Sequence, residues 1–214
     1  MSERRPRRVY LPELPRKTAL RTEIHARTEM GELMEIEIRD LQDGDIGALA
    51  KIEAGDMDLK LSRIDLSELC RESILDFYEI LSKSDVQVEI DLPKQAVFVQ
   101  GDREALQRIL FNLVSNAVRY GSAGKYLGVI LHSDETYVYV DVVDHGQGIE
   151  KSFAGRIFDR LFTMEDSRSR SIQGNGLGLK IAKNLALQMG GDITLDSIPH
   201  VRTTFTLRLK KMRY

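Results

Sequence analysis

The stretch from Asp102 to Gly121, DREALQRILFNLVSNAVRYG, places the strongest constraint on what this chain can fold into. Its apolar residues recur at spacings of three and four, which predicts a helix that packs one face against a core and stops at about Gly121. These residues are Leu106, Ile109, Leu110, Leu113, Val114 and Ala117. Asn112 and Asn116 stand four residues apart, so they stack on nearly one line beside the apolar stripe. An amide there can offer its oxygen to Mg²⁺ or hydrogen-bond a phosphate, although asparagines on helices are more often ordinary surface residues.

The composition is that of a soluble globular protein with one good core. The chain has 214 residues, of which 42% are hydrophobic and 30% charged, and its net charge is −2. That charge argues against general nucleic-acid binding. No apolar run approaches the roughly 20 residues that a bilayer requires. The single cysteine, Cys70, excludes an internal disulfide and suits a reducing compartment, so we expect a cytoplasmic location and a buried, inert thiol.

The first sixty residues predict a tail followed by a helical hairpin. Residues 1–10 are rich in arginine and contain Pro6, which indicates a disordered basic tail. Residues 11–60 predict a hairpin that turns near Gly31. Its approximate apolar stripe consists of Leu33, Ile36, Leu41, Ile46, Leu49 and Ile52. A hairpin this thin cannot bury its own stripe, so we expect it to form a homodimer, most simply a four-helix arrangement.

Residues 61–214 predict a second domain of mixed helices and strands. Its first half predicts a strand near Met57–Leu61, a helix from Asp65 or Ser67 to about Ser82, and adjacent strands at 86–92 and 96–99. The helix described above follows, and after it come paired strands at 127–132 and 137–143. A helix from Gly178 to Met189 and strands at 192–196 and 203–209 complete the domain. Helices segregated on one face of a mostly antiparallel sheet follow from this order. We therefore predict an α+β fold, a two-layer α/β sandwich preceded by the hairpin.

Two glycine clusters follow the asparagine helix in the sequence. The first, VDVVDHGQGI (140–149), ends a strand at Asp144 and continues with Gly146 and Gly148. A carboxylate there can accept a hydrogen bond from an exocyclic amine, and glycines let the backbone approach a ligand, although such a turn is also common in ordinary loops. His145 is expected to face solvent.

The second cluster, QGNGLGL (173–179), lies where a helix begins. Backbone N–H groups and the positive end of the helix dipole make such a place suitable for phosphate. No Gly-Lys-Ser/Thr follows, and no βαβ unit surrounds it, which excludes a P-loop and a dinucleotide fingerprint. The hydrophilic segment between the clusters, residues 151–172, is a candidate mobile lid.

In this order the motifs resemble the ATP-binding domain of sensor histidine kinases, within the superfamily shared with gyrase, Hsp90 and MutL. The N box is identified as NLVSNAVRYG (112–121), the G1 box as DHGQG (144–148), the F box as IFDRLF (157–162) and the G2 box as GNGLGL (174–179). Residues 50–69 resemble the end of a dimerisation hairpin and its linker. The resemblance implies an ATP-dependent histidine protein kinase of two-component signalling, with ATP and Mg²⁺ as ligands and a response regulator as partner.

The resemblance also implies roles for single residues. Asn116 would coordinate Mg²⁺, and Asn112 would contact phosphate. Arg119 would add positive charge, Tyr120 would stack on or hydrogen-bond the nucleotide, and Asp144 would receive the adenine amino group. The ATP-binding set is completed by Gly146, Gly148, Phe158, Gly174, Gly176, Leu177 and Gly178.

The N-terminus departs from the family pattern. The phosphoacceptor box of the family reads His-Glu/Asp-hydrophobic-Arg-Thr-Pro, and Pro12 occupies the histidine position of the nearest string, PELPRKT. His25 is the only histidine of the hairpin, so it is the candidate acceptor, with an ordinary helix-surface histidine as the alternative.

Three functions stay open at this point. The first is the kinase, in which the γ-phosphoryl group passes to a histidine and then to a response-regulator aspartate. The second is a dimerising pseudokinase that binds nucleotide without autophosphorylation, and the third is an anti-sigma-type serine kinase. The F box and the linker favour the histidine-kinase lineage over the third. Any membrane association would come through a sensor region that this sequence does not contain.

Overall fold

The structure, a computed structural model, describes residues 58–160 and 176–212. The predicted tail and turn of the hairpin, with His25, lie outside the described residues, as does most of the candidate lid. Among the described residues no helix is both long and apolar enough to cross a membrane.

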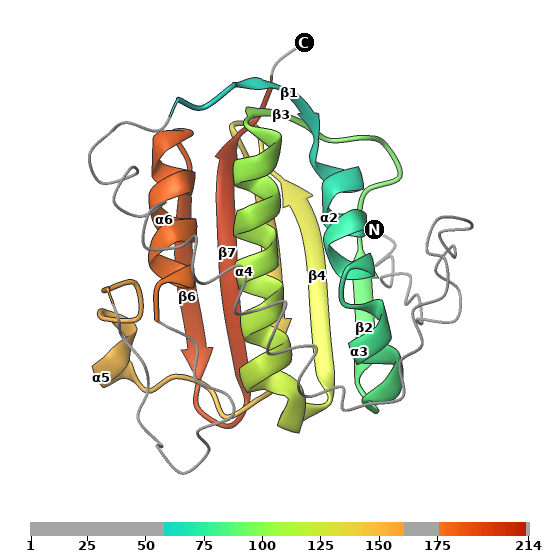
Figure 1. The fold of residues 1–214 in the computed structure, drawn as a ribbon, viewed down its shortest axis with the longest axis vertical. Helices are drawn as coiled ribbons and strands as arrows, with labels where there is room; N and C mark the ends of the chain where they lie inside the picture. Colours follow the sequence, from blue (N-terminus) through green and yellow to red (C-terminus); the bar gives the residue numbers. More distant parts are fainter. Residues whose placement is uncertain (1–57, 161–175, 213–214) are drawn as a thin grey trace, which may run out of the picture.

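A five-stranded sheet forms one layer and helices form the other (Figure 1). The spatial order is β2 (Gln87–Asp91), β4 (Tyr126–Ser133), β5 (Tyr137–Asp144), β7 (Arg202–Lys210) and β6 (Asp192–Ile198). β2 runs parallel to β4, and the other neighbours are antiparallel. One face is covered by α2 (Leu66–Leu75), α3 (Tyr78–Lys83), α4 (Arg103–Gly121) and α6 (Gly178–Gln188). The predicted two-layer α/β sandwich is confirmed.

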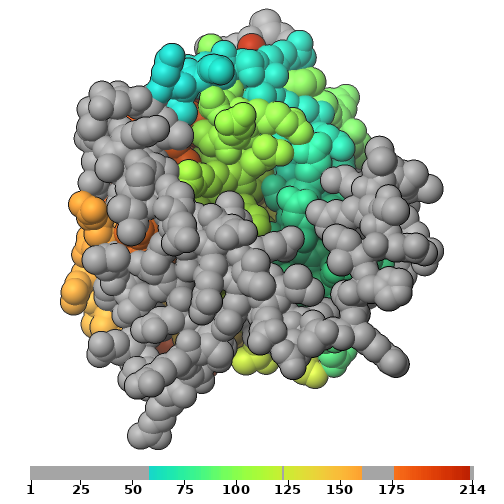
Figure 2. All heavy atoms as spheres, in the orientation of Figure 1, coloured from blue at the N-terminus to red at the C-terminus, as the bar shows by residue number. Residues whose placement is uncertain are grey.

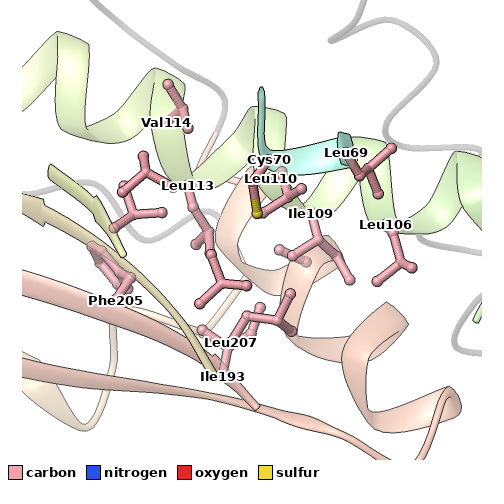
Figure 3. Packing of buried hydrophobic residues seen from close by; sticks show 14 of the residues in the cluster. Leu69, Cys70, Leu106, Ile109, Leu110, Leu113, Val114, Ile193, Phe205 and Leu207 are labelled. Carbon is pink, nitrogen blue, oxygen red and sulfur yellow. The ribbon is translucent and has the colours of Figure 1, made fainter. Parts of the chain in front are cut away.

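The central helix α4 holds the two layers together. All six residues of its predicted apolar stripe are buried. Figure 3 shows Leu110 and Leu113 on the side of α4 that faces Phe205, Leu207 and Ile193 of β6 and β7, and all of these residues belong to one buried cluster. Beside α4 in the same layer lies α2, and atoms of both helices form one continuous surface (Figure 2). Because the stripe fixes the rotation of α4, it also fixes where Asn112 and Asn116 lie.

The structure contains a small second sheet, and one predicted strand pairing is therefore wrong. The strands predicted at 86–92 and 96–99 are not neighbours, because β3 (Phe98–Gly101) pairs with β1 (Ser62–Asp65) and not with β2. The backbone before β3 is bound to the start of α2: Val97 accepts the Leu66 N–H at 2.8 Å and donates to the Ser67 hydroxyl at 3.2 Å. These bonds direct the chain away from β2 after Pro93, and β3 forms an antiparallel bridge from Val99 to Lys211, just after β7.

The predicted helix from Asp65 to about Ser82 is two helices. Asp65 caps α2 as expected, accepting the N–H groups of Ser67 and Glu68. The helix then breaks at Asp76, because Phe77 is buried and packs on Phe111 of α4, with ring centroids 5.1 Å apart. The strand expected near Met57–Leu61 begins later, at Ser62, after a tight turn between Leu59 and Leu61, and Met57 lies outside the described residues.

Candidate functional site

Asn112 and Asn116 lie half-buried on the α4 surface, one turn apart. Asn112 faces the first residue of α6. A Cβ added to Gly178 would come within 2.6 Å of the Asn112 amide oxygen, so the absence of a side chain at Gly178 leaves room for the Asn112 amide. The amide of Asn112 therefore lies beside the N-terminus of α6, where backbone N–H groups and the helix dipole favour an anion.

Asp144 is the last residue of β5, and the residue as a whole is 5% exposed. Within the described part of the chain, the Gly146 N–H is the only hydrogen-bond donor to this carboxylate, at 2.8 Å. Burial raises the pKa of Asp144 to about 6, and the Gly146 bond opposes this rise only in part. A buried carboxylate without an ion-pair partner is costly to the fold, which is typical of a group kept for a ligand.

Glycines fix the position of Asp144 against the end of α4. A Cβ on Gly121 would lie 2.3 Å from the Asp144 Cβ, and one on Gly146 would lie 2.4 Å from the Tyr120 carbonyl oxygen. Gly121 does end α4, as predicted, but its main role is to leave room for Asp144. Gly124 makes a similar contact, since its Cβ would meet the His145 carbonyl oxygen at 2.0 Å. The end of α4 and the loop after β5 therefore interlock through positions that tolerate no side chain.

The other end of this loop rests on the turn between β6 and β7. Gly148 has a φ of +74°, and its Cβ would meet the Pro199 Cα at 2.6 Å. The His200 N–H donates to the Gln147 carbonyl at 2.9 Å, and the Ile149 N–H donates to the Ser197 hydroxyl at 2.8 Å. The loop from residue 145 to residue 149 is thus held at both ends.

Two aromatic residues border the same loop. His145 is exposed, as predicted, and its ring stacks on Tyr126 with centroids 4.1 Å apart. Tyr120, at the end of α4, is 44% exposed, and its carbonyl oxygen lies against Gly146. Arg119, its neighbour, is half-buried.

Phe158 follows the short helix α5 (Lys151–Ala154) and packs toward the core. Its ring meets Phe205 edge-on at 6.4 Å, and the Lys183 ammonium lies 5.0 Å above it. Lys183 also forms an ion pair with Asp192 at 2.5 Å. In this structure Phe158 anchors the start of the candidate lid to the sheet.

The second glycine cluster is described only in part. Gly176 has a φ of +65°, Leu177 is buried, and Gly178 begins α6 as the sequence predicted. Gly174 lies outside the described residues. The structure thus brings Asn112 together with Gly178. It also brings Gly121 together with Asp144 and Gly146. Along α4, Asn116 and Arg119 lie between these two contacts.

The residues present fit a nucleotide with Mg²⁺ better than a metal centre built from protein groups alone. Among the described residues no cluster of three or more His, Cys, Asp or Glu could hold a metal ion. Mg²⁺ commonly takes one or two protein oxygens and completes its shell with phosphates and water. The half-buried amide of Asn116 could supply such an oxygen next to a triphosphate.

Sequence reasoning missed two contributors to the site. Gly124 carries no motif, and Ser197 is one of many serines at strand ends, so neither had a signal of its own. Both become visible only through contacts between segments distant in the sequence.

The comparisons agree with this geometry. Residues 101–213 match the family described as histidine kinase-, DNA gyrase B-, and HSP90-like ATPase. The chain is 43% identical over 166 residues to the sensor histidine kinase YcbM of Bacillus subtilis (strain 168), covering 78% of this chain and 53% of that protein. It is 34% identical over 138 residues to the sensor histidine kinase WalK of the same organism, covering 64% of this chain and 23% of that protein. The chain therefore spans about half of the length of YcbM and less of WalK.

Solved structures show the same fold. The Acinetobacter baumannii histidine kinase AdeS matches with a TM-score of 0.68 at 20% identity, covering 85% of this chain and 82% of that chain. The mycobacterial sensor histidine kinase MprB matches with a TM-score of 0.62 at 26% identity, covering 72% of this chain and 100% of that chain. Since the family match includes α4, the Asp144 loop and α6, this chain belongs to the histidine kinase-, DNA gyrase B- and HSP90-like ATPase family.

Proposed function

We propose that this chain is the ATP-binding catalytic part of a sensor histidine kinase, which transfers the γ-phosphoryl group of ATP to a histidine and from there to an aspartate of a response regulator. The observation that carries the proposal is the buried Asp144 carboxylate in its glycine-lined surroundings. An exocyclic amine is a suitable partner, because it would donate a second hydrogen bond to a carboxylate that accepts one from the Gly146 N–H.

The residues divide between the two ends of the nucleotide. Asp144 accepts the adenine amino group, while Gly146 and Gly148 let the ring approach the backbone, and Tyr120 borders it. At the other end Asn112 and the N–H groups at the start of α6 receive phosphate, and Asn116 offers its oxygen to Mg²⁺. Mg²⁺, when bound, would supply charge neutralisation at the phosphates. The protein contributes positioning, which is most of what phosphoryl transfer requires.

The remaining parts of the proposal concern residues outside the described ranges. The hairpin of residues 11–60 forms the homodimer, and the response regulator is the partner that receives the phosphoryl group. One observation favours the pseudokinase as a second candidate function. The nearest match to the family's phosphoacceptor box has Pro12 at the histidine position, so the chain could bind ATP and signal by shape alone.

Calorimetry with ATP and with inorganic triphosphate, each with Mg²⁺, tests the nucleotide site. We expect the wild-type chain to bind ATP, and Asp144→Asn to weaken ATP binding much more than triphosphate binding. The amide lacks the carboxylate charge and can turn a donor toward the amine. Equal losses for both ligands would mean that Asp144 has only a structural role, and no binding by the wild type would refute the proposal.

The transfer reaction is tested separately, with γ-labelled ATP and a second polypeptide that carries an intact phosphoacceptor box. A histidine phosphate is labile in acid and stable in base, so we expect label with this stability on the added polypeptide. ATP binding with no transfer to any histidine would favour the pseudokinase.

A further inference from the structure

The hydroxyl of Ser197 connects three segments near Asp144. It accepts the Ile149 N–H at 2.8 Å and lies 3.2 Å from the Arg202 carbonyl oxygen and 3.3 Å from the Thr203 hydroxyl. Ile149 belongs to the loop after β5, whereas Arg202 and Thr203 begin β7. One half-buried side chain therefore joins the end of β6 to the next strand and to the loop.

Ser197 and Asp144 also belong to the same row of the sheet. Thr203 of β7 is paired with Ser197 on one side and with Asp144 on the other. Neighbouring strands lie about 4.8 Å apart, so Ser197 and Asp144 are separated by roughly 10 Å across the row. This is about the span that the loop from residue 145 to residue 149 has to bridge before it reaches the Ser197 hydroxyl.

Few other interactions fix the conformation of the loop from residue 145 to residue 149. Gly146 and Gly148 are both buried and carry no side chain to pack, and Gly148 has a positive φ. Glycines lose more conformational entropy on ordering than other residues, so a loop that contains two of them depends on its hydrogen bonds. After Gly148 the bond to Ser197 is the first one that a side chain provides.

We propose that Ser197 is a positioning residue for the purine end of the nucleotide site, where it holds the loop so that Gly146, Gly148 and the Asp144 carboxylate face one ligand. The inference rests on the proposed function. Ser197 itself touches no reacting atom. Its effect should therefore fall on the affinity for every adenine nucleotide, and not on the response to Mg²⁺.

Two variants of matched shape test the role of the hydroxyl. Ser197→Thr keeps the hydroxyl, and Ser197→Val replaces it with a methyl group of nearly the same size, while both β-branched residues suit a strand. The loss of one hydrogen bond predicts Kd values for ATP and ADP that are roughly three- to tenfold higher in Ser197→Val. In Ser197→Thr the Kd values should stay within about twofold of the wild type, which is below the effect of one lost bond.

Hydrogen exchange gives a second measurement that general destabilisation would not reproduce. The Ile149 amide should lose protection in Ser197→Val and keep it in Ser197→Thr, while amides of α4 stay unchanged in both. Ser133→Ala is the control, because Ser133 lies at the opposite end of the sheet and its hydroxyl accepts an exposed hydrogen bond from Lys211 at 3.1 Å. It should leave both measurements unchanged.

The outcomes separate this inference from the proposed function. If the wild-type chain binds no adenine nucleotide, the proposed function is refuted, and so is the inference that rests on it. Wild type that binds ATP, together with Ser197→Val that binds it equally well, leaves the function standing and refutes the role of Ser197. Equal losses of nucleotide affinity in Ser197→Val and Ser197→Thr would also refute the role of Ser197. The shape of the strand, and not the hydroxyl, would then be responsible for the loss of affinity.

Discussion

At the scale of single residues, the carboxyl group of Asp144 is in an environment that favours its neutral form. Burial raises its pKa from the usual 3.8 to about 6. Between these two values the folded chain holds a proton that the unfolded chain has released. Asp144 therefore contributes stability below about pH 4, and this contribution is lost as the pH rises through about 6. At neutral pH the free protein contains a charged carboxylate that a ligand amine would relieve.

Asp144→Asn should consequently change stability in a pH-dependent way. The amide cannot ionise, so we expect the variant to gain stability relative to wild type as the pH rises from 4 to 7.5, by up to about 3 kcal/mol. Urea unfolding of the nucleotide-free proteins at several pH values measures this difference. A constant difference between the two proteins across that range would show that Asp144 does not titrate as its burial implies.

The amide of Asn116 should matter only in the presence of metal. Removing its oxygen in Asn116→Ala takes away a ligand that no carboxylate cluster among the described residues can replace. We expect ATP affinity measured with Mg²⁺ to fall about tenfold or more, and affinity measured with EDTA to change little, since one charge-assisted contact contributes roughly 1.5 to 3 kcal/mol. Unchanged Mg·ATP affinity in calorimetry would remove Asn116 from the metal site.

At the scale of elements, the sequence predicted the helices and strands that local periodicity encodes. It missed the features that depend on contacts between segments distant in the sequence. The stripe of α4, the paired strands β4 and β5 and the start of α6 all follow from local patterns, and the structure confirms them. The wrong neighbours of β2 and β3 arose because adjacency in sequence suggested adjacency in the sheet, whereas the bonds between Val97 and α2 direct β3 elsewhere. For Gly121 the sequence predicted a helix stop, and the contact with Asp144 lay beyond any local signal.

The contact between α4 and the Asp144 loop predicts a sharp difference between two glycines. In Gly121→Ala the new methyl group would lie 2.3 Å from the Asp144 Cβ, so the helix end or the strand end has to move. Overpacking of this kind costs about 1 to 3 kcal/mol, and the displaced carboxylate should also weaken ATP binding. Gly155→Ala is the control, because nothing lies within 4 Å of its Cβ and its φ of −73° suits alanine. Similar melting temperatures and ATP affinities for both variants would contradict the interlock.

At the scale of the whole molecule, the described domain has its own core and does not require a partner to bury it. The sequence pattern of the hairpin, in contrast, provides no core of its own that would bury the approximate apolar stripe of residues 33–52. We therefore expect the full chain to form a dimer in sedimentation experiments and a chain that begins at Asp58 to be a monomer. A full chain that stays monomeric at high micromolar concentration would show that the hairpin does not dimerise.

The chain as written should bind ATP but label itself poorly with the γ-phosphoryl group. The acceptor has to present an imidazole nitrogen in line with the γ-phosphorus, and a neighbouring acid helps to keep the ring in its reactive tautomer. Pro12 offers no nucleophile, and Glu13 then has no ring to orient. His25 follows about 13 residues later, which in a helix is a distance of roughly 20 Å, too far for a site arranged to reach the usual position. Incubation with γ-labelled ATP should thus give little protein-bound label. Label that is acid-labile, base-stable and absent from His25→Gln would overturn this prediction and make His25 the phosphoacceptor.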